Sequence, residues 1–162
     1  MTQDRAPGPA PQPARYFDDL KPGERFVTGE RALGEAEIVA FAREFDPQPI
    51  HVDAERAADG PYGGLIASGF QTMALGSRLF YELGVINEAC IGGPGIDAVR
   101  FHRPARPGDR IHTVATVAET RASRSKPDRG YVRMAYDVRN QRDEPVLSFE
   151  IVHILMRRPS AP

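Results

Sequence analysis

Apolar side chains in the first third of the chain recur at the spacing of an α-helix. Four of them fall at i, i+3, i+4 and i+7, as one face of a helix requires: Ile38, Phe41, Ala42 and Phe45. Asp46 precedes a proline, and a residue in that position is pushed out of the α region. We therefore expect this helix to end near Asp46. The stretch before it, residues 24–33, is a plausible first strand.

Two more helices are predicted from their capping residues. Asp53 can cap a short helix that runs through about Ala58. Ser68 starts the segment SGFQTMALGSRLFYELG, and Gln71 three residues later completes a capping-box pattern. The apolar residues of this segment cover more than one helical face, which predicts a buried helix that Gly84 ends: Phe70, Met73, Ala74, Leu75, Leu79, Phe80 and Leu83.

After a glycine-rich turn, IGGPG, the apolar period changes to two. We predict strands near residues 96–103, 110–121, 130–140 and 145–157. Apolar residues share one side of each of the last two strands: Val132, Met134, Tyr136 and Val138, then Leu147, Phe149, Ile151 and Leu155. This pattern is typical of an antiparallel sheet covered on one face. One long buried helix and about five strands predict an α+β fold in which the sheet wraps around the helix.

Size and charge narrow the class of protein. A chain of 162 residues suits one domain with a real core. Residues 1–14 are rich in proline and alanine and predict a disordered tail, followed by a single domain over 15–158 and a short C-terminal tail at 159–162. The formal net charge is −1, with both signs spread along the chain, which argues against a nucleic-acid binder.

The absence of several sequence patterns bears on the cellular compartment of the protein and on whether it binds a metal. No stretch approaches the roughly 20 apolar residues of a membrane span, and we find no secretory signal pattern. The one cysteine, Cys90, has no partner for an internal disulfide, which fits a reducing cytoplasm. His102, His112 and His153 lie singly on predicted strands without ligand spacing. We expect a cytoplasmic protein with no metal site and no membrane or nucleic-acid partner.

Candidate chemistry is concentrated in the stretch FDPQPIHVDAERA, residues 45–57. It holds Asp46 and His51 five positions apart, with two prolines between them. An aspartate and a histidine on so rigid a loop can hold one water molecule between them and transfer its protons. Alternatively, Asp46 only ends a helix and His51 is a satisfied core residue. The spacing alone leaves both interpretations open.

Gly69 is a second candidate, at the start of the long helix. The first N–H groups of a helix have no intrahelical acceptor, and the helix dipole favours negative charge there. The N–H of Gly69 could therefore stabilise a developing oxyanion. A glycine at this position could also serve only close packing.

These segments resemble a known family. FDPQPIHVDAERAADGPYGGLIASGF and VRFHRPARPGDRI look like the MaoC-like dehydratases, which include the (R)-specific enoyl-CoA hydratases, and the resemblance covers about residues 16–157. The family motif is Asp, any residue, Asn or Gln, Pro, a hydrophobic residue and His, with a glycine later, and it is matched by Asp46, Gln48, Pro49, Ile50, His51 and Gly69. Many members have histidine where this chain has Ser68. Serine is a good N-cap, so we expect no loss of activity from it.

The resemblance implies a hotdog fold, in which a curved antiparallel sheet wraps a long helix. It also implies reversible hydration of a trans-2-enoyl-CoA to a (R)-3-hydroxyacyl-CoA, with Asp46 and His51 as the acid–base pair and Gly69 as the oxyanion donor. Further contacts to the substrate are expected from five residues: Gln48, Pro49, Ile50, Ser68 and Phe70. The expected assembly is a homodimer, and no cofactor is expected beyond the coenzyme A of the substrate.

Two other functions stay open. A hotdog acyl-CoA thioesterase would use the same helix start but hydrolyse the C–S bond, and the Asp46–His51 pair favours the hydratase over it. A non-catalytic acyl-thioester-binding or structural subunit would need neither the pair nor the glycine. Four basic residues near one predicted turn could meet the phosphates of coenzyme A or could form only a solvated turn: Arg121, Arg124, Lys126 and Arg129.

Overall fold

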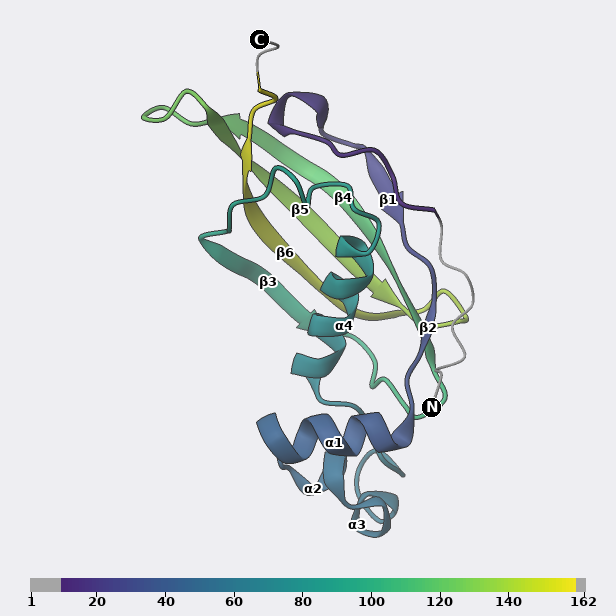
Figure 1. Ribbon diagram of the computed structural model, residues 1–162. Helices are drawn as coiled ribbons and strands as arrows, with labels where there is room; N and C mark the ends of the chain where they lie inside the picture. The colour runs from purple at the N-terminus through teal and green to yellow at the C-terminus, as the bar shows by residue number, and fades with distance from the viewer. Residues whose placement is uncertain (1–9, 160–162) are drawn as a thin grey trace.

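The computed structural model describes residues 10–159 and consists of helices at one end of a sheet that curves around one longer helix (Figure 1). The helices are the 3₁₀ helix η1 (Phe17–Asp19), α1 (Glu35–Phe45), α2 (Pro49–Val52), α3 (Ala54–Ala58) and α4 (Gly69–Tyr81). The strands are β1 (Arg25–Val27), β2 (Arg31–Ala32), β3 (Gly95–Phe101), β4 (Arg110–Ala122), β5 (Arg129–Arg139) and β6 (Pro145–Met156). Within this described part of the chain, no helix has both the length and the apolar character needed to cross a bilayer.

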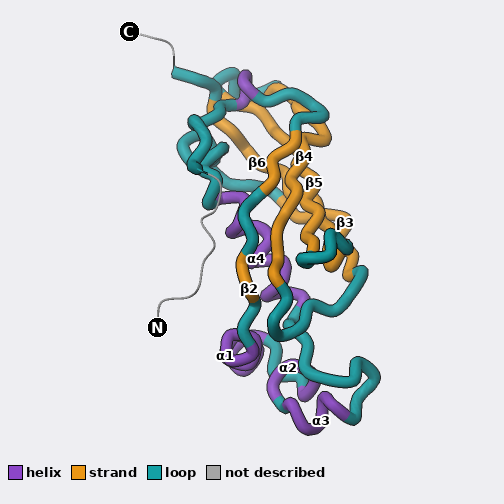
Figure 2. Tube along the Cα trace, turned by 90° about the vertical axis from the view of Figure 1, so that its right-hand side faces the viewer, coloured by secondary structure: helices purple, strands orange, loops and turns teal. Residues whose placement is uncertain are grey.

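The sheet is antiparallel, with strand order β1-β4-β5-β6-β3, and β2 pairs with β4 outside this path. The long strands β4, β5 and β6 form two successive hairpins. They curve past α4, while α1, α2 and α3 lie together at one end (Figures 1 and 2). The predicted α+β hotdog arrangement, a long helix wrapped by a curved antiparallel sheet, is confirmed.

The core lies between α4 and the inner face of the sheet. The predicted inward residues of β5 and β6 are all buried: Val132, Met134, Tyr136, Val138, Leu147, Phe149, Ile151 and Leu155. The ring of Phe80 on α4 meets that of Tyr136 edge to face, with centroids 5.5 Å apart. A Cβ on Gly76 would lie 2.5 Å from Val138 Cγ2. Glycine at this position lets α4 approach the sheet closely.

Two predictions about the first half of the chain are wrong in detail. The single strand expected at 24–33 is two short strands, because Thr28 Oγ1 donates to Gly29 O and accepts from Thr113 N at the break between them. The long helix is not covered on every side. Phe70 is 61% exposed and Ala74 is exposed too, so one face of α4 is open within residues 10–159.

The predicted tails fall mostly outside the described part of the chain. Residues 1–9 and 160–162 are not described. Within the described part, Gln12 N donates to Leu83 O and Arg15 N to Val85 O, so this segment runs along the C-terminal end of α4. Arg158 stacks over the ring of Tyr16 from the other end of the chain. The tail boundaries and the single domain over 15–158 stay predictions.

Candidate active site

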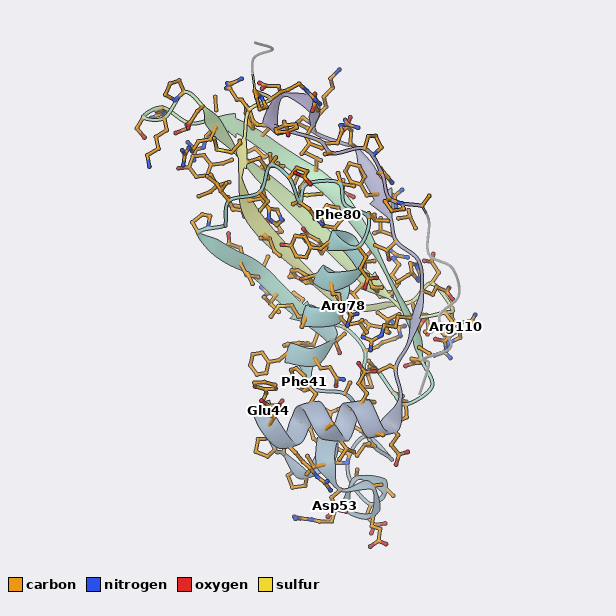
Figure 3. The ribbon with its side chains drawn as sticks, viewed as in Figure 1. Phe41, Glu44, Asp53, Arg78, Phe80 and Arg110 are labelled. Carbon is orange, nitrogen blue, oxygen red and sulfur yellow. The ribbon has the colours of Figure 1, made fainter. Side chains whose placement is uncertain are left out.

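The candidate residues meet where three helix ends converge. Asp46 is the C-cap of α1, His51 lies on α2, and Gly69 begins α4. Figure 3 shows Phe41 and Glu44 of α1 beside the N-terminal end of α4, which brings the end of one helix close to the start of the other. Residues separated by more than 20 positions in sequence thereby share one small volume.

The segment between Asp46 and His51 is partly helical, which the stiff-loop prediction did not include. Gln48 is extended, as expected before a proline, with φ −74° and ψ 142°. Pro49 then begins the helical turn α2, where its fixed φ and missing N–H cause no loss. This turn carries His51 inward, so that only 5% of the residue is exposed.

The tautomer of neutral His51 is set by a backbone carbonyl. Its Nδ1 lies 2.8 Å from Ile66 O, and a carbonyl oxygen can only accept a hydrogen bond. Nδ1 therefore carries the proton, and in the neutral imidazole Nε2 is left as an acceptor. Nε2 lies 3.4 Å from Asp46 Oδ2. His51 is thus held in one orientation by its buried side and presents its basic nitrogen to the aspartate.

The carboxylate of Asp46 is held by two donors. Gln48 Nε2 donates to Oδ1 at 2.8 Å, and Ser68 Oγ donates to Oδ2 at 2.7 Å. The Gln48 bond, followed by the Ser68 bond, lowers the pKa of Asp46, and burial only partly opposes them. Asp46 is therefore ionised at neutral pH. Asp46 Oδ2 and neutral His51 Nε2 are then both acceptors, so a water molecule beside them can donate one hydrogen to each.

Ser68 does more than cap a helix. It is fully buried, and its Oγ accepts from Phe70 N at 3.2 Å while donating to Asp46. The predicted capping box is wrong, because the amide of Gln71 lies 3.4 Å from Glu37 O on α1 instead of reaching back to Ser68. One hydroxyl thus links the start of α4 to the carboxylate at the end of α1.

Gly69 has two features that bear on the site: a backbone N–H at the start of α4 and no side chain. As the first residue of α4, it has no intrahelical acceptor for its N–H, and the dipole of a 13-residue helix favours negative charge there. A Cβ on Gly69 would lie 2.3 Å from Phe101 Cε1. Both interpretations of this glycine, oxyanion donor and close packing, are therefore compatible with its surroundings.

A cavity of about 520 Å³ opens beside these groups, within the usual range for a small-molecule site. Six of the predicted site residues line it: Asp46, Gln48, Ile50, His51, Gly69 and Phe70. Pro49 and Ser68 are not among the described residues that line it; Pro49 starts α2 and Ser68 supports Asp46. The sequence did not single out other wall residues, which include Tyr62, Thr72, Phe101, Arg103, Val146 and Leu147.

The basic residues near position 125 lie at the opposite end of the sheet. Val138 on β5 pairs with Leu147, which lines the cavity. Arg129 lies nine residues from Val138 along β5, a distance of about 30 Å at the rise of a β-strand. Figure 1 shows this hairpin at the end of the sheet away from α1. The run therefore lies far from the cavity of its own chain. Among residues 10–159, no three His, Cys, Asp or Glu side chains gather as metal ligands would.

The chain is similar to known proteins both in sequence and in fold. The model of a family described as the MaoC like domain matches residues 19–138. YdeM of Bacillus subtilis, an uncharacterised protein, is 31% identical over 141 residues, which are 87% of this chain and 99% of YdeM. The 3-hydroxyacyl-thioester dehydratase Z of Mycobacterium tuberculosis is 40% identical over 73 residues, 44% of this chain and 48% of that protein. The crystal structure of the MaoC-like dehydratase from Rhodospirillum rubrum superposes with a TM-score of 0.84 at 39% identity, covering 90% and 99% of the two chains.

Proposed function

Since the chain belongs to the MaoC-like dehydratase family, we propose that it catalyses the reversible hydration of a trans-2-enoyl-CoA to a (R)-3-hydroxyacyl-CoA. One observation carries the proposal: two hydrogen-bond acceptors, Asp46 Oδ2 and His51 Nε2, lie 3.4 Å apart at the wall of a cavity that the Gly69 N–H also reaches. This arrangement supports water activation and carbonyl polarisation at one site, as hydration of a conjugated thioester requires. The (R) configuration is taken from the family resemblance.

Water addition begins at the acid–base pair. The water that donates to Asp46 and His51 loses a proton to this pair as its oxygen adds to the β-carbon. Ionised Asp46 and the neutral Nε2 of His51 both attract that proton, and Ile66 O holds the imidazole in place through Nδ1. General acid–base catalysis of this kind contributes about 10²–10⁴-fold.

Addition at the β-carbon places negative charge on the thioester oxygen. The N–H of Gly69 at the start of α4 donates to this oxygen and stabilises the enolate. The proton held by the Asp46–His51 pair then passes to the α-carbon. Water has been added across the double bond, and both side chains have returned to their starting protonation states, so the same groups serve the reverse dehydration.

An acyl thioester as substrate is supported by the cavity and by one relative. The cavity joins these polar groups to apolar walls from Ile50, Val146 and Leu147, which suit an acyl chain. The relative from Mycobacterium tuberculosis is named as a dehydratase of 3-hydroxyacyl thioesters. Arg103, which lines the cavity, is better placed for a phosphate-bearing carrier than the basic residues near position 125 are.

The test is a panel of trans-2-enoyl-CoA esters followed by loss of the conjugated absorbance. We expect hydration without added metal or cofactor, and a 3-hydroxyacyl-CoA of (R) configuration on a chiral assay. A parallel assay with saturated acyl-CoA detects free thiol. Release of thiol without hydration would make the protein a thioesterase, and acyl-CoA binding without either reaction would make it a binding subunit.

We further propose that the protein acts as a homodimer. β3 pairs with β6 on one side, and no strand of residues 10–159 pairs with its other edge, which is a risk for uncontrolled association. Exposed apolar side chains lie near that edge and near the start of α4: Phe70, Ile91, Ile96 and Phe101. Light scattering at low micromolar concentration should give twice the chain mass of 17.8 kDa. A monomer with full activity would contradict this assembly.

A further inference from the structure

Phe101 lies directly against the proposed oxyanion donor. It is the last residue of β3, and it lines the same cavity as Asp46 and His51. Three of its ring atoms would lie within 3.1 Å of a Cβ on Gly69, so the ring packs on the Cα of that residue. Phe101 is 66% exposed overall. The ring therefore lies beside Gly69, forms part of the cavity wall and keeps exposed surface.

A β-bulge brings the ring to this position. Ile96 pairs with Ile151 and Phe101 pairs with Leu147, so β3 uses five steps where β6 uses four. Cross-strand partners share a face, and both partners on β6 are buried on the inner face. Without the extra residue, Phe101 would point to the outer face of the sheet.

The bulge carries an unusual backbone conformation as well. Ala98, inside the irregular stretch between Asp97 and Arg100, has φ +52°, which is uncommon for a residue other than glycine. Bulges of this kind often turn a side chain toward an active site. The irregular stretch of β3 thus lies directly before Phe101 and turns its side chain toward Gly69.

From this geometry we propose that Phe101 is a positioning residue for the thioester: its ring covers the Gly69 N–H and forms the apolar wall against which the acyl group lies. The proposal rests on the proposed hydratase function. A donor works best on developing charge where water is excluded. A cover next to Gly69 strengthens this interaction in the transition state more than it strengthens ground-state binding, so its loss should lower kcat more than it raises KM.

The first test removes the ring. In Phe101→Ala we expect kcat to fall about tenfold, because water then reaches the donor, and less than the roughly 10²–10³-fold typical for loss of the donor itself. Phe101→Leu, which keeps an apolar cover, should recover most of that loss. Val27→Ala is the control, since Val27 on β1 is 55% exposed and does not line the cavity. It should keep the wild-type kcat.

A double-mutant cycle with Gly69→Ala tests the contact itself. The added Cβ must displace the ring in the wild-type background, so we expect Gly69→Ala to lower kcat there and to have little further effect in Phe101→Ala. Additive effects would overturn the proposal, as would an unchanged kcat in Phe101→Ala. A fall in kcat accompanied by a lower molecular mass in light scattering would also overturn it, because dissociation of the assembly would then explain the loss. The melting temperatures of the four proteins in the cycle can be measured without any turnover. We expect the effects of Gly69→Ala and Phe101→Ala on the melting temperature to be non-additive as well. If the wild type hydrated no enoyl-CoA, the proposed function would fail, and the thermal cycle would still test the contact.

Discussion

Replacing Ser68 by alanine should destabilise the protein in a way that depends on the charge of Asp46. The hydroxyl caps α4 through Phe70 N, and loss of such a cap costs about 1 kcal/mol. The same hydroxyl donates to the ionised Asp46 at 2.7 Å, and a hydrogen bond to a charged group contributes about 1.5–3 kcal/mol. We expect Ser68→Ala to lower the free energy of unfolding by about 2.5–4 kcal/mol at pH 7.

The pH dependence separates the two contributions. The folded-state pKa of Asp46 lies below its unfolded value, so its stabilising bonds are fully present above the unfolded pKa of about 3.9 and are lost as pH falls through the lower folded pKa. The difference between wild type and Ser68→Ala should therefore shrink in acid toward the cap contribution. The acid limb of kcat/KM should also move to higher pH in the variant, because Asp46 loses one of the donors that hold it ionised.

Urea unfolding of a double-mutant cycle is the assay. In an Asp46→Asn background the carboxylate is gone, and we expect Ser68→Ala to cost only about 1 kcal/mol there. If Ser68→Ala cost the same in both backgrounds, or less than about 0.5 kcal/mol in the wild type, the Ser68–Asp46 bond would have no energetic role.

Three further predictions concern Gly69, His153 and Gly76. Gly69→Pro should lower kcat at least about 10²-fold relative to Gly69→Ala, because both add a Cβ against Phe101 and only proline removes the N–H; equal rates would exclude the oxyanion role. Burial lowers the pKa of His153 to about 4, so the free energy of unfolding should fall as pH drops from about 6.5 to 4, and His153→Gln should show a flatter profile in urea titrations. Gly76→Ala should destabilise by about 1–3 kcal/mol despite the better helix former, because its Cβ would lie 2.5 Å from Val138 Cγ2; a higher melting temperature would show that the core relaxes there.

The sequence predicted the elements whose pattern is local. The end of α1 at Asp46, the cap at Asp53 and the inward residues of β5 and β6 all appear where expected, although Phe45 of the predicted α1 stripe is 61% exposed. Each depends on neighbours within a few positions, or on a period of two or 3.6 that burial of one face reinforces. The extended conformation of Gln48 is local in the same sense, because the following proline imposes it.

Tertiary contacts decided the features that were mispredicted or missed. Ser68 and Gln71 have the spacing of a capping box, yet the hydroxyl binds Asp46 from a different helix and Gln71 turns toward α1. Phe70 has the character of a core residue, but it is 61% exposed among the residues that the structure describes. The bulge that aims Phe101 depends on register with β6, which no short-range pattern of β3 reveals.

The sequence predicted which residues gather at the candidate site better than how they are arranged there. The motif from Asp46 to His51 indicated an acid–base pair, and the pair does face a cavity. The proton position on His51 was not readable, since it depends on Ile66 O, 15 residues further along the chain. The walls from β3 and β6 also come from segments that only the folded sheet brings together.

The most direct measurement of the central claim is the hydration rate of Asp46→Asn and His51→Ala on the best enoyl-CoA substrate of the wild type. Both variants should remain folded by circular dichroism, and each should lose at least about 10²-fold in kcat, the lower range for a general acid–base group. Either variant retaining more than about a tenth of the wild-type rate would contradict the account. The shared water would then not be the nucleophile.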